Sequence, residues 1–403
     1  MKQLLIFISA IVLLTACNKK EDSDPSGPDK QTVIVYISGE NDLSTFAPKD
    51  TAEMIIGSKS LGNGYNYIAF FDMANSSESP SIWKYEDGKK TLIKQYEEDF
   101  YNSDPDKMLE ILQWIIDKYP AQKYGLVLWG HATGWVIASD SIAIPQTSPL
   151  RRAYGRDTGD NSRDTKKGKW INIPTLANVL KHLTVKFDYI FCDCCNMSNA
   201  EAAYELRKQT NYLIASPAEI PGYGAPYNKI TPYLFSTDTE AYKSLIDTYA
   251  NEYAGQLPLA LIKMDEMEQL ANATRVLLQT LEPTAEKDFV FDDLMYYDGV
   301  RSRNLRTLFD MNDLFLQNAT TENYQQWKQA LDRAVIYKRY ASSWQSNGHV
   351  NFSLFKPTEE KFGGICMYFP RTFYDNDSYS STYNSTYHQM QWYWATGWNN
   401  YGW

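Results

Sequence analysis

Short apolar runs alternate with amphipathic segments along most of the chain. Five runs rich in β-branched and aromatic residues are each followed by turn-forming residues, which is typical of strands. The clearest helix signal begins at Ser103, Asp104 and Pro105, continues with apolar residues at helical spacing, and ends at Pro120. Strands separated by helical crossovers predict an α/β fold with a mainly parallel sheet flanked by helices. The predicted strands are 33–37, 67–71, 124–129, 189–191 and 212–215.

The pattern changes after about residue 260. Helical periodicity covers 264–281 and 322–340, and strand-like runs follow at 349–355 and 364–369. A length of 403 residues suits two structural units at about 150 residues per domain. We therefore expect a main domain over residues 32–262 and a smaller C-terminal α+β subdomain over residues 263–403, packed on it. The aromatic-rich end of that subdomain favours core or interface packing over a sugar-binding surface.

The N-terminus carries an export signal. The apolar run 4–14 follows Lys2 and is too short to span a bilayer, which takes about 20 apolar residues, so residues 1–16 are predicted to be a signal peptide. The letters L-T-A-C that end at Cys17 resemble the lipobox of bacterial lipoproteins, which implies lipidation of Cys17. The alternative is an ordinary signal peptide with a chance cysteine. Residues 17–31 are predicted to be a flexible tether, so we expect an exported bacterial lipoprotein, anchored in the membrane on the periplasmic side or the cell surface.

Composition narrows the classes of function. The chain is 43% hydrophobic and 22% charged, as in folded domains, and its net charge of -10 argues against nucleic acid as a partner. The same negative net charge is compatible with a basic substrate.

Apart from Cys17, the cysteines are Cys192, Cys194, Cys195 and Cys366. Three of these lie within four residues, which excludes a disulfide scaffold and calls for a chemical interpretation.

A histidine and a cysteine follow two of the predicted strands. His131 comes directly after the strand at 124–129 and Gly130, and Cys195 follows the apolar run 187–191. In an open parallel sheet, ligands bind at the carboxyl ends of the strands, so these two side chains can meet. A thiolate beside an imidazole is the machinery of a cysteine peptidase, and a helix predicted after Cys195 would favour the thiolate. The alternatives are a structural histidine and an inert buried thiol.

Two short motifs resemble those of a known family. The letters H-A-T-G-W from His131 are similar to an H-G-x-G-W box, and D-C-C-N-M-S-N-A-E from Asp193 is similar to a D-A-C-L-M-x-x-x-E box, both of the clostripain family of cysteine peptidases. Further matches lie at 36–43, 216–227 and 364–370. The resemblance runs from about residue 32 to the C-terminus and implies a caspase-like fold.

The resemblance also implies roles for individual residues. His131 would be the general acid/base and Cys195 the nucleophile of a Cys/His dyad, with the backbone N–H groups of Ala132 and Cys195 as the oxyanion hole. Asp193 would line the S1 pocket and select Arg or Lys, because a carboxylate there gives a charge-assisted partner to a cation. Glu219 is a weaker S1 candidate. The alternatives are a strand-end cap for Asp193 and a solvated loop acid for Glu219.

Three residues depart from the family pattern. Ala132 replaces a glycine and keeps the N–H but restricts the backbone. Cys194 replaces a usual alanine and leaves two adjacent thiols, and Asn196 replaces an apolar residue.

A basic, polar segment separates the two motifs. Family members are processed in this interval, and the segment holds several Arg and Lys residues between positions 151 and 169. A flexible loop beside the cleft has a high effective concentration there, so we expect self-cleavage after Arg151, Arg152 or Arg156. The alternative is a solvated charged loop that never enters the site.

Two other functions compete with a peptidase. Cys192, Cys194, Cys195 and His131 are potential metal ligands, but C-x-C-C is not a usual zinc spacing, so no metal site is expected. A non-catalytic surface-binding lipoprotein with a degenerate peptidase fold is the second alternative. No cofactor is expected, and a calcium requirement stays open because no loop has EF-hand spacing. The sequence thus predicts a cysteine endopeptidase whose substrates are proteins or peptides with basic P1 residues.

Overall fold

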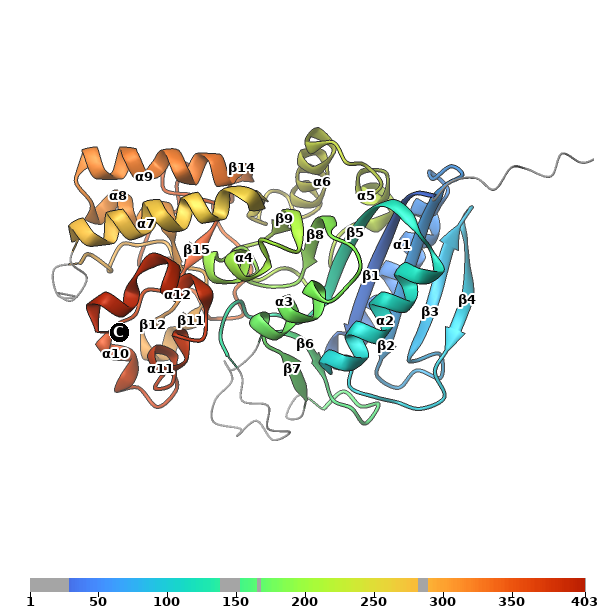
Figure 1. The fold of residues 1–403 in the computed structure, drawn as a ribbon. Helices are drawn as coiled ribbons and strands as arrows, with labels where there is room; N and C mark the ends of the chain where they lie inside the picture. The colour runs from blue at the N-terminus through green and yellow to red at the C-terminus, as the bar shows by residue number, and fades with distance from the viewer. Residues whose placement is uncertain (1–28, 138–152, 165–167, 282–288, 403) are drawn as a thin grey trace, which may run out of the picture.

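A nine-stranded mixed sheet runs through the centre of the molecule (Figure 1). The computed structural model describes residues 29–137, 153–164, 168–281 and 289–402. The strand order is β14-β10-β9-β8-β5-β1-β2-β3-β4, and the five strands from β9 to β2 in this order are parallel. Those five contain the predicted strands, and they are β1 (Asp29–Gly39), β2 (Tyr65–Met73), β5 (Ala121–Gly130), β8 (Phe187–Asp193) and β9 (Thr210–Ala215).

Antiparallel strands close both ends of the sheet. At one end are β3 (Ser81–Glu86) and β4 (Lys89–Gln95), and at the other are β10 (Leu259–Lys263) and β14 (Val335–Arg339). Three small ribbons lie outside the sheet and pair β6 (Tyr154–Asp157) with β7 (Lys169–Ile171), β11 (Gly299–Val300) with β12 (Leu305–Arg306), and β13 (Phe309–Asp310) with β15 (Cys366–Met367).

Helices cover both faces of the sheet, as predicted. On one face lie α2 (Pro105–Lys118), α3 (Ile173–Lys181) and α4 (Ala200–Leu206), and on the other lie α1 (Ala47–Ser58), α5 (Tyr227–Leu234) and α6 (Thr239–Glu252). Alternate residues of β1 supply the two cores: Ile34 packs toward α2, whereas Val33 and Val35 pack toward α1. Each such fully buried side chain stabilises the fold by roughly 1.5–3 kcal/mol.

The start of α2 shows how the sequence sets an element's boundary. Asp104 accepts hydrogen bonds from the N–H groups of Asp106 and Lys107, and Pro105 occupies the first turn, where its missing donor costs nothing. The apolar stripe of α2 is fully buried against the sheet. The sequence prediction for this helix is therefore confirmed.

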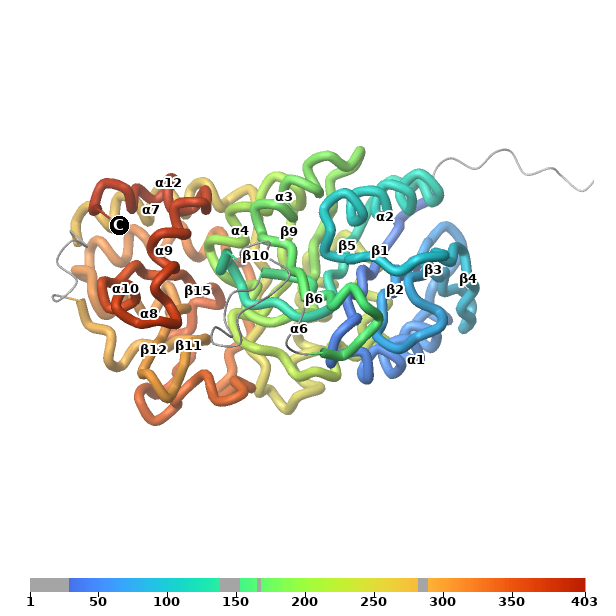
Figure 2. Tube along the Cα trace, turned by 90° about the horizontal axis from the view of Figure 1, so that it is seen from below, coloured from blue at the N-terminus to red at the C-terminus, as the bar shows by residue number. Residues whose placement is uncertain are grey.

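The C-terminal region packs at one end of the sheet (Figures 1 and 2). Its aromatic side chains are mostly core: Trp392 and Trp398 are fully buried, and Trp135 from the first part of the chain lies 4.6 Å from the Tyr368 ring centroid. The helices of this region are α7 (Met267–Leu281), α8 (Met311–Asn318), α9 (Thr321–Ala334), α10 (Thr372–Asp375), α11 (Tyr383–Tyr387) and α12 (Gln391–Thr396).

Several predicted boundaries are wrong. The helix expected over 322–340 ends at Ala334, because the β-branched run that follows pairs with β10 as strand β14. The run 349–355 forms no strand, and 364–369 contributes only the two residues of β15. Strand β1 begins at Asp29, inside the expected tether. The central sheet also continues past residue 263, because β14 belongs to it.

The described residues include no helix that is both long and apolar enough to cross a membrane.

Candidate active site

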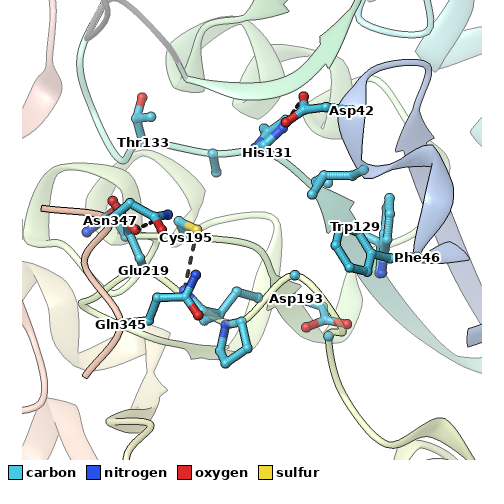
Figure 3. Close-up of a pocket in the computed structure, with 18 of the residues that line it drawn as sticks. Asp42, Phe46, Trp129, His131, Thr133, Asp193, Cys195, Glu219, Gln345 and Asn347 are labelled. Atoms are coloured by element: carbon cyan, nitrogen blue, oxygen red, sulfur yellow. Dashed lines mark hydrogen bonds and ion pairs between the residues drawn. The ribbon is translucent and has the colours of Figure 1, made fainter. Parts of the chain in front are cut away.

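The ends of two neighbouring parallel strands carry His131 and Cys195. Strands β5 and β8 pair in a register that sets Trp129 opposite Asp193, so the residues that follow them emerge at the same edge of the sheet. Both His131 and Cys195 line one cleft with a volume of about 310 Å³ (Figure 3). The side chains that sequence reasoning selected from distant segments therefore share one cavity.

The turn into His131 depends on a glycine. Gly130 has φ of 145°, and a Cβ at this position would lie 2.8 Å from the backbone oxygen of Ser38. Only glycine fits both the backbone conformation and this close approach to β1.

A carboxylate holds the imidazole of His131. Nε2 of His131 lies 3.0 Å from Oδ1 of Asp42, the first residue of a short 3-10 helix, η1 (Asp42–Thr45), after β1. When Nε2 of the neutral His131 ring carries the proton and donates a hydrogen bond to Asp42, Nδ1 is unprotonated and can act as an acceptor. Burial opposes ionisation of Asp42, but the His131 hydrogen bond, the His131 charge and the guanidinium of Arg156 outweigh it and lower the pKa of Asp42 to about 2. Asp42 thus stays ionised and stabilises a protonated ring.

Sequence reasoning did not assign Asp42 a role. The available signal was its place in the 36–43 motif, which the resemblance already included. Its contact with His131 depends on how β1 and β5 pair, and no local pattern reports that pairing.

Cys195 lies in the loop after β8 and not at the start of a helix. Helix α4 begins at Ala200 and is capped by Asn199, so the expected help from the helix dipole is wrong. The N–H of Ile220 donates to Sγ of Cys195 over 3.4 Å instead. Burial and, next, repulsion from Glu219 raise the pKa of Cys195 to about 12, and the Ile220 hydrogen bond opposes this only in part. Cys195 is therefore a neutral thiol at neutral pH.

Asp193 is buried at the wall of the cleft. Oδ2 accepts hydrogen bonds from the N–H of Ala225 (3.0 Å) and the hydroxyl of Tyr227 (2.9 Å), and Oδ1 accepts one from the hydroxyl of Tyr249 (2.7 Å). Its partners come from other elements, so it does not serve as a cap of its own strand. Burial raises the pKa of Asp193, although all three hydrogen bonds oppose the shift.

A second carboxyl group lies close to Asp193. Asp50 in α1 is fully buried and accepts a hydrogen bond from Nε1 of Trp129 over 2.8 Å. Burial and repulsion from Asp193 raise the pKa of Asp50 to about 9. A Cβ at Gly224 would lie 2.9 Å from Asp193 and 3.5 Å from Asp50, so glycine is needed beside both acids. Sequence patterns did not single out Asp50, because one acidic residue in an amphipathic helix cannot be told by sequence from an acid on the solvent-exposed face.

Glu219 is part of the cleft and not a solvated loop acid. It lies in the loop after β9, and its side chain is only 8% exposed. Nδ2 of Asn347 donates to Oε2 over 2.7 Å, and Nδ1 of His349 lies 2.7 Å from Oε1. The segment 345–349, which sequence reasoning predicted only to precede or begin a strand, thus contributes to the same cleft as Cys195.

Known proteins resemble this chain over nearly its whole length. The model of the clostripain family matches residues 35–403. The chain belongs to the clostripain family. It is therefore a cysteine-type peptidase with a caspase-like fold, and the alternative of a non-catalytic binding lipoprotein has no support.

Two solved clostripain-family structures are similar. One is a secreted C11 cysteine protease from Bacteroides thetaiotaomicron in complex with an irreversible peptide inhibitor, with 28% identity, a TM-score of 0.72, and coverage of 92% of this chain and 99% of that one. The other is an inactive zymogen C11 protease from Parabacteroides distasonis, with 25% identity, a TM-score of 0.71, and coverage of 91% and 98%. No curated protein sequence matches the chain.

The residues that depart from the family pattern lie in different environments. Ala132 forms a bridge with Tyr154 in which Thr133 and Gly155 donate the hydrogen bonds, so the N–H of Ala132 is not used by the bridge. Cys194 is completely buried with Cys192 in the core on the α3 side, whereas Cys195 packs on the opposite core. The adjacent thiols of Cys194 and Cys195 therefore face different environments. The zinc alternative fails because Cys192 and Cys194 lie in the core on the α3 side, away from the cleft.

Only one of the predicted processing sites lies in the described part of the chain. Arg151 and Arg152 fall outside the described residues. Arg156 lies in β6, is 3% exposed, and pairs with Asp42, and its guanidinium also donates to the backbone oxygen of Asp164. Cleavage after Arg156 is therefore not supported, because a peptidase needs an exposed, extended bond and this one is buried in a ribbon.

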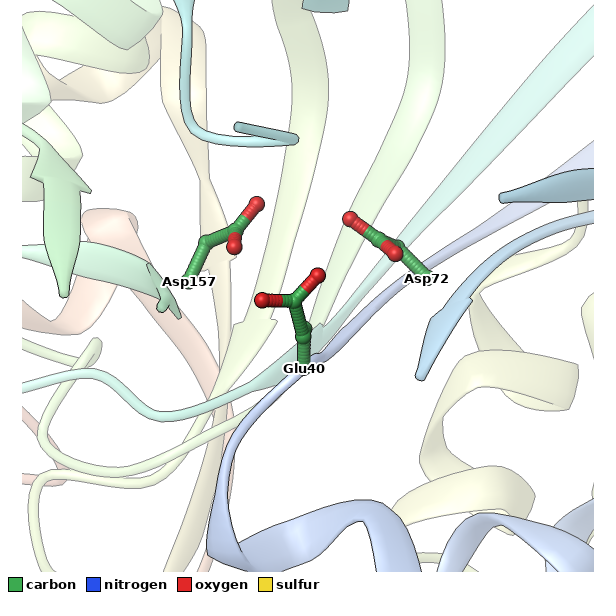
Figure 4. Close-up of side chains that lie close together, drawn as sticks. All are labelled: Glu40, Asp72 and Asp157. Carbon is green, nitrogen blue, oxygen red and sulfur yellow. The ribbon is translucent and has the colours of Figure 1, made fainter. Parts of the chain in front are cut away.

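Three more acids gather near the strand ends. The carboxylates of Glu40, Asp72 and Asp157 lie within 4.8 Å of one another (Figure 4). Burial raises the pKa of all three, and repulsion from the other two adds to that of Asp157. Oxygen ligands of this kind suit hard cations, but protein donors already bind them: Thr158 donates to Glu40, and the side chain of Asn102 donates to Asp72. The cluster ties the β6 segment to β1 and β2, beside the residues that hold His131.

We predict that Asp42→Asn lowers kcat roughly tenfold to a hundredfold with little change in KM, because the amide neither stabilises the imidazolium nor fixes the tautomer. Steady-state kinetics on a peptide substrate measure this effect. Asp106→Asn, at an exposed acid of α2, is the matched control and should leave both constants unchanged. A wild-type kcat in Asp42→Asn contradicts the role of Asp42.

Proposed function

We propose that this peptidase is an endopeptidase that hydrolyses bonds after Arg or Lys, with Cys195 as nucleophile and His131 as general acid/base. The observation that carries the proposal is the single cleft lined by His131, Cys195 and the carboxylate of Asp193. The peptide inhibitor bound by the Bacteroides thetaiotaomicron relative is consistent with a peptide substrate.

The resting thiol decides the order of the chemical steps. Because the pKa of Cys195 is about 12, proton transfer from Sγ to His131 accompanies the attack of sulfur on the carbonyl carbon. The C–O double bond opens to an oxyanion, which the N–H groups of Ala132 and Cys195 would stabilise. His131 then gives its proton to the leaving amine, and the acyl-enzyme forms. Water, deprotonated by His131, releases the acid and restores the thiol.

Buried carboxyl groups support the preference for a basic P1 side chain. Asp193 and Asp50 lie beside Gly224 and Trp129, in a region where burial disfavours their charged forms. A guanidinium or ammonium supplies the missing counter-charge and forms charge-assisted hydrogen bonds in a low-dielectric site. A neutral P1 side chain offers neither, and this difference supports the proposed discrimination between Arg and Leu.

Self-processing is part of the proposal. Arg151 and Arg152 lie in the interval between His131 and Cys195, and the Parabacteroides distasonis relative is described as an inactive zymogen. We propose that the cut follows one of these two arginines. The two fragments would stay together, because β5 and β8 on either side of the interval are paired.

Export and anchoring through Cys17 complete the proposal. The Bacteroides thetaiotaomicron relative is described as secreted, and the apolar run before Cys17 is too short to span a bilayer. A lipid on Cys17 would hold the peptidase at the membrane through residues 17–28.

We predict that Cys195→Ala abolishes peptide hydrolysis, with a loss of at least about 10³-fold, and also abolishes nicking in the 151–152 region. Cys194→Ala is the matched control, because its thiol is buried in the opposite core, and it should keep most of the activity. Hydrolysis of an Arg peptide and denaturing gels of both variants measure these effects. Loss in Cys194→Ala with retention in Cys195→Ala reverses the assignment, and nicking in Cys195→Ala without added enzyme contradicts self-processing.

We predict that Asp193→Asn lowers kcat/KM for Arg and Lys peptides by roughly tenfold to a hundredfold and changes thermal stability much less, since the buried cation loses its counter-charge. Asp188→Asn is the control, because Asp188 lies at the other end of β8 and pairs with Lys123. Equal kcat/KM of the unmutated protein toward Arg and Leu peptides contradicts the specificity.

We predict that Cys17→Ala moves the protein from the membrane fraction to the soluble exported fraction, because no lipid can then be attached. Fractionation followed by immunoblotting measures the distribution. An unchanged membrane fraction contradicts anchoring through Cys17.

A further inference from the structure

A charged cluster from two distant parts of the chain lies beside the Cys195 thiol. Nδ1 of His349 lies 2.7 Å from Oε1 of Glu219 and 3.2 Å from Oδ1 of Asp298. Glu219 follows β9, whereas Asp298 precedes β11 and His349 lies between β14 and β15. All three line the cleft that contains Cys195.

Glu219 and Asp298 disfavour the thiolate. Both side chains are almost fully buried, at 8% and 6% exposed, and both raise the pKa of Cys195. The field of a buried carboxylate reaches Sγ with little screening by water. Without a counter-charge, these two acids would oppose the step in which Cys195 loses its proton.

His349 is the counter-charge. Asp298 and Glu219 raise the pKa of His349 to about 10, although burial opposes the shift, so the ring is a cation at neutral pH. The charged groups acting on the ring are thus these two acids, and the other titratable groups that line the cleft are Asp42, His131, Asp193 and Cys195 itself.

The same contacts fix the geometry around sulfur. His349 and Asn347 engage the two carboxylate oxygens of Glu219. The next residue, Ile220, donates its N–H to Sγ of Cys195. Holding Glu219 therefore holds the donor that favours the thiolate.

We infer that His349 is a positioning residue of this peptidase, which neutralises Glu219 and Asp298 and so makes the Cys195 thiol ionisable during attack. The inference rests on the proposed role of Cys195 as nucleophile. By this inference the C-terminal region takes part in the reaction electrostatically, through the ion pair between His349 and Glu219.

The test is the rate at which iodoacetamide alkylates Cys195, measured against pH by peptide mapping on the full chain. In His349→Gln we expect the alkylation midpoint to move to higher pH and the rate at pH 8 to fall about tenfold, since one pKa unit is a tenfold change in thiolate. For an Arg peptide, kcat should fall while KM changes little. The double variant His349→Gln, Glu219→Gln should recover much of the rate, because one uncompensated acid is gone.

Controls separate this effect from a structural one. His182→Gln, at an exposed histidine that ends α3, should alkylate as the unmutated protein does. A folded His349→Gln with an unchanged alkylation profile overturns the inference. If His349→Gln does not fold, the comparison of Glu219→Gln with the double variant decides, because these two variants differ only at residue 349, which pairs with Asp298. Slower alkylation in the double variant than in Glu219→Gln then supports the inference, and equal rates overturn it.

The alkylation readout also separates this inference from the proposed function. An unmutated protein that hydrolyses no peptide contradicts the proposed function, yet its alkylation profile still measures what His349 does to the thiol. A normal hydrolysis rate in His349→Gln contradicts the inference and leaves the proposed function intact.

Discussion

The parallel pairing of β5 with β8 is the constraint on which the rest of the site depends. Setting Trp129 opposite Asp193 sends the residues after both strands to one edge of the sheet, so His131 and Cys195 reach the same cleft although they lie 64 positions apart in the sequence. Parallel strands need a crossover, and the crossover here leaves room for the basic segment and the β6–β7 ribbon. β6 then contributes Arg156, which helps to keep Asp42 charged beside His131.

Burial of charge is the second organising feature. Asp193, Asp50 and Cys195 all lie where water is scarce, and burial is the largest cause of the raised pKa of each. Burial therefore disfavours the charged form of each group until a partner of opposite charge stabilises it. A cationic P1 side chain would do so for the acids, and the His131–Asp42 pair would do so for the proton that leaves the thiol.

The C-terminal region contributes to the candidate active-site cleft as well as to the core. Its strand β14 extends the central sheet through β10, and its segment 345–349 reaches the cleft. The buried tryptophans of α12 and η5 (Trp398–Tyr401) explain the aromatic enrichment of the tail without a sugar-binding surface. Stability of this region and the environment of Cys195 are consequently linked, because His349 bridges Asp298 of this region and Glu219 of the main domain.

The sequence by itself determined the parallel α/β architecture, the boundaries of α2, and the two strand ends that carry His131 and Cys195, because hydrophobic period, capping residues and short motifs are local properties. Only the tertiary structure decided that 335–339 is a strand, that Arg156 is buried, and which side chains surround the reacting groups. Asp42, Asp50 and His349 gain their roles from partners far away in sequence, and no local pattern records a distance across the fold.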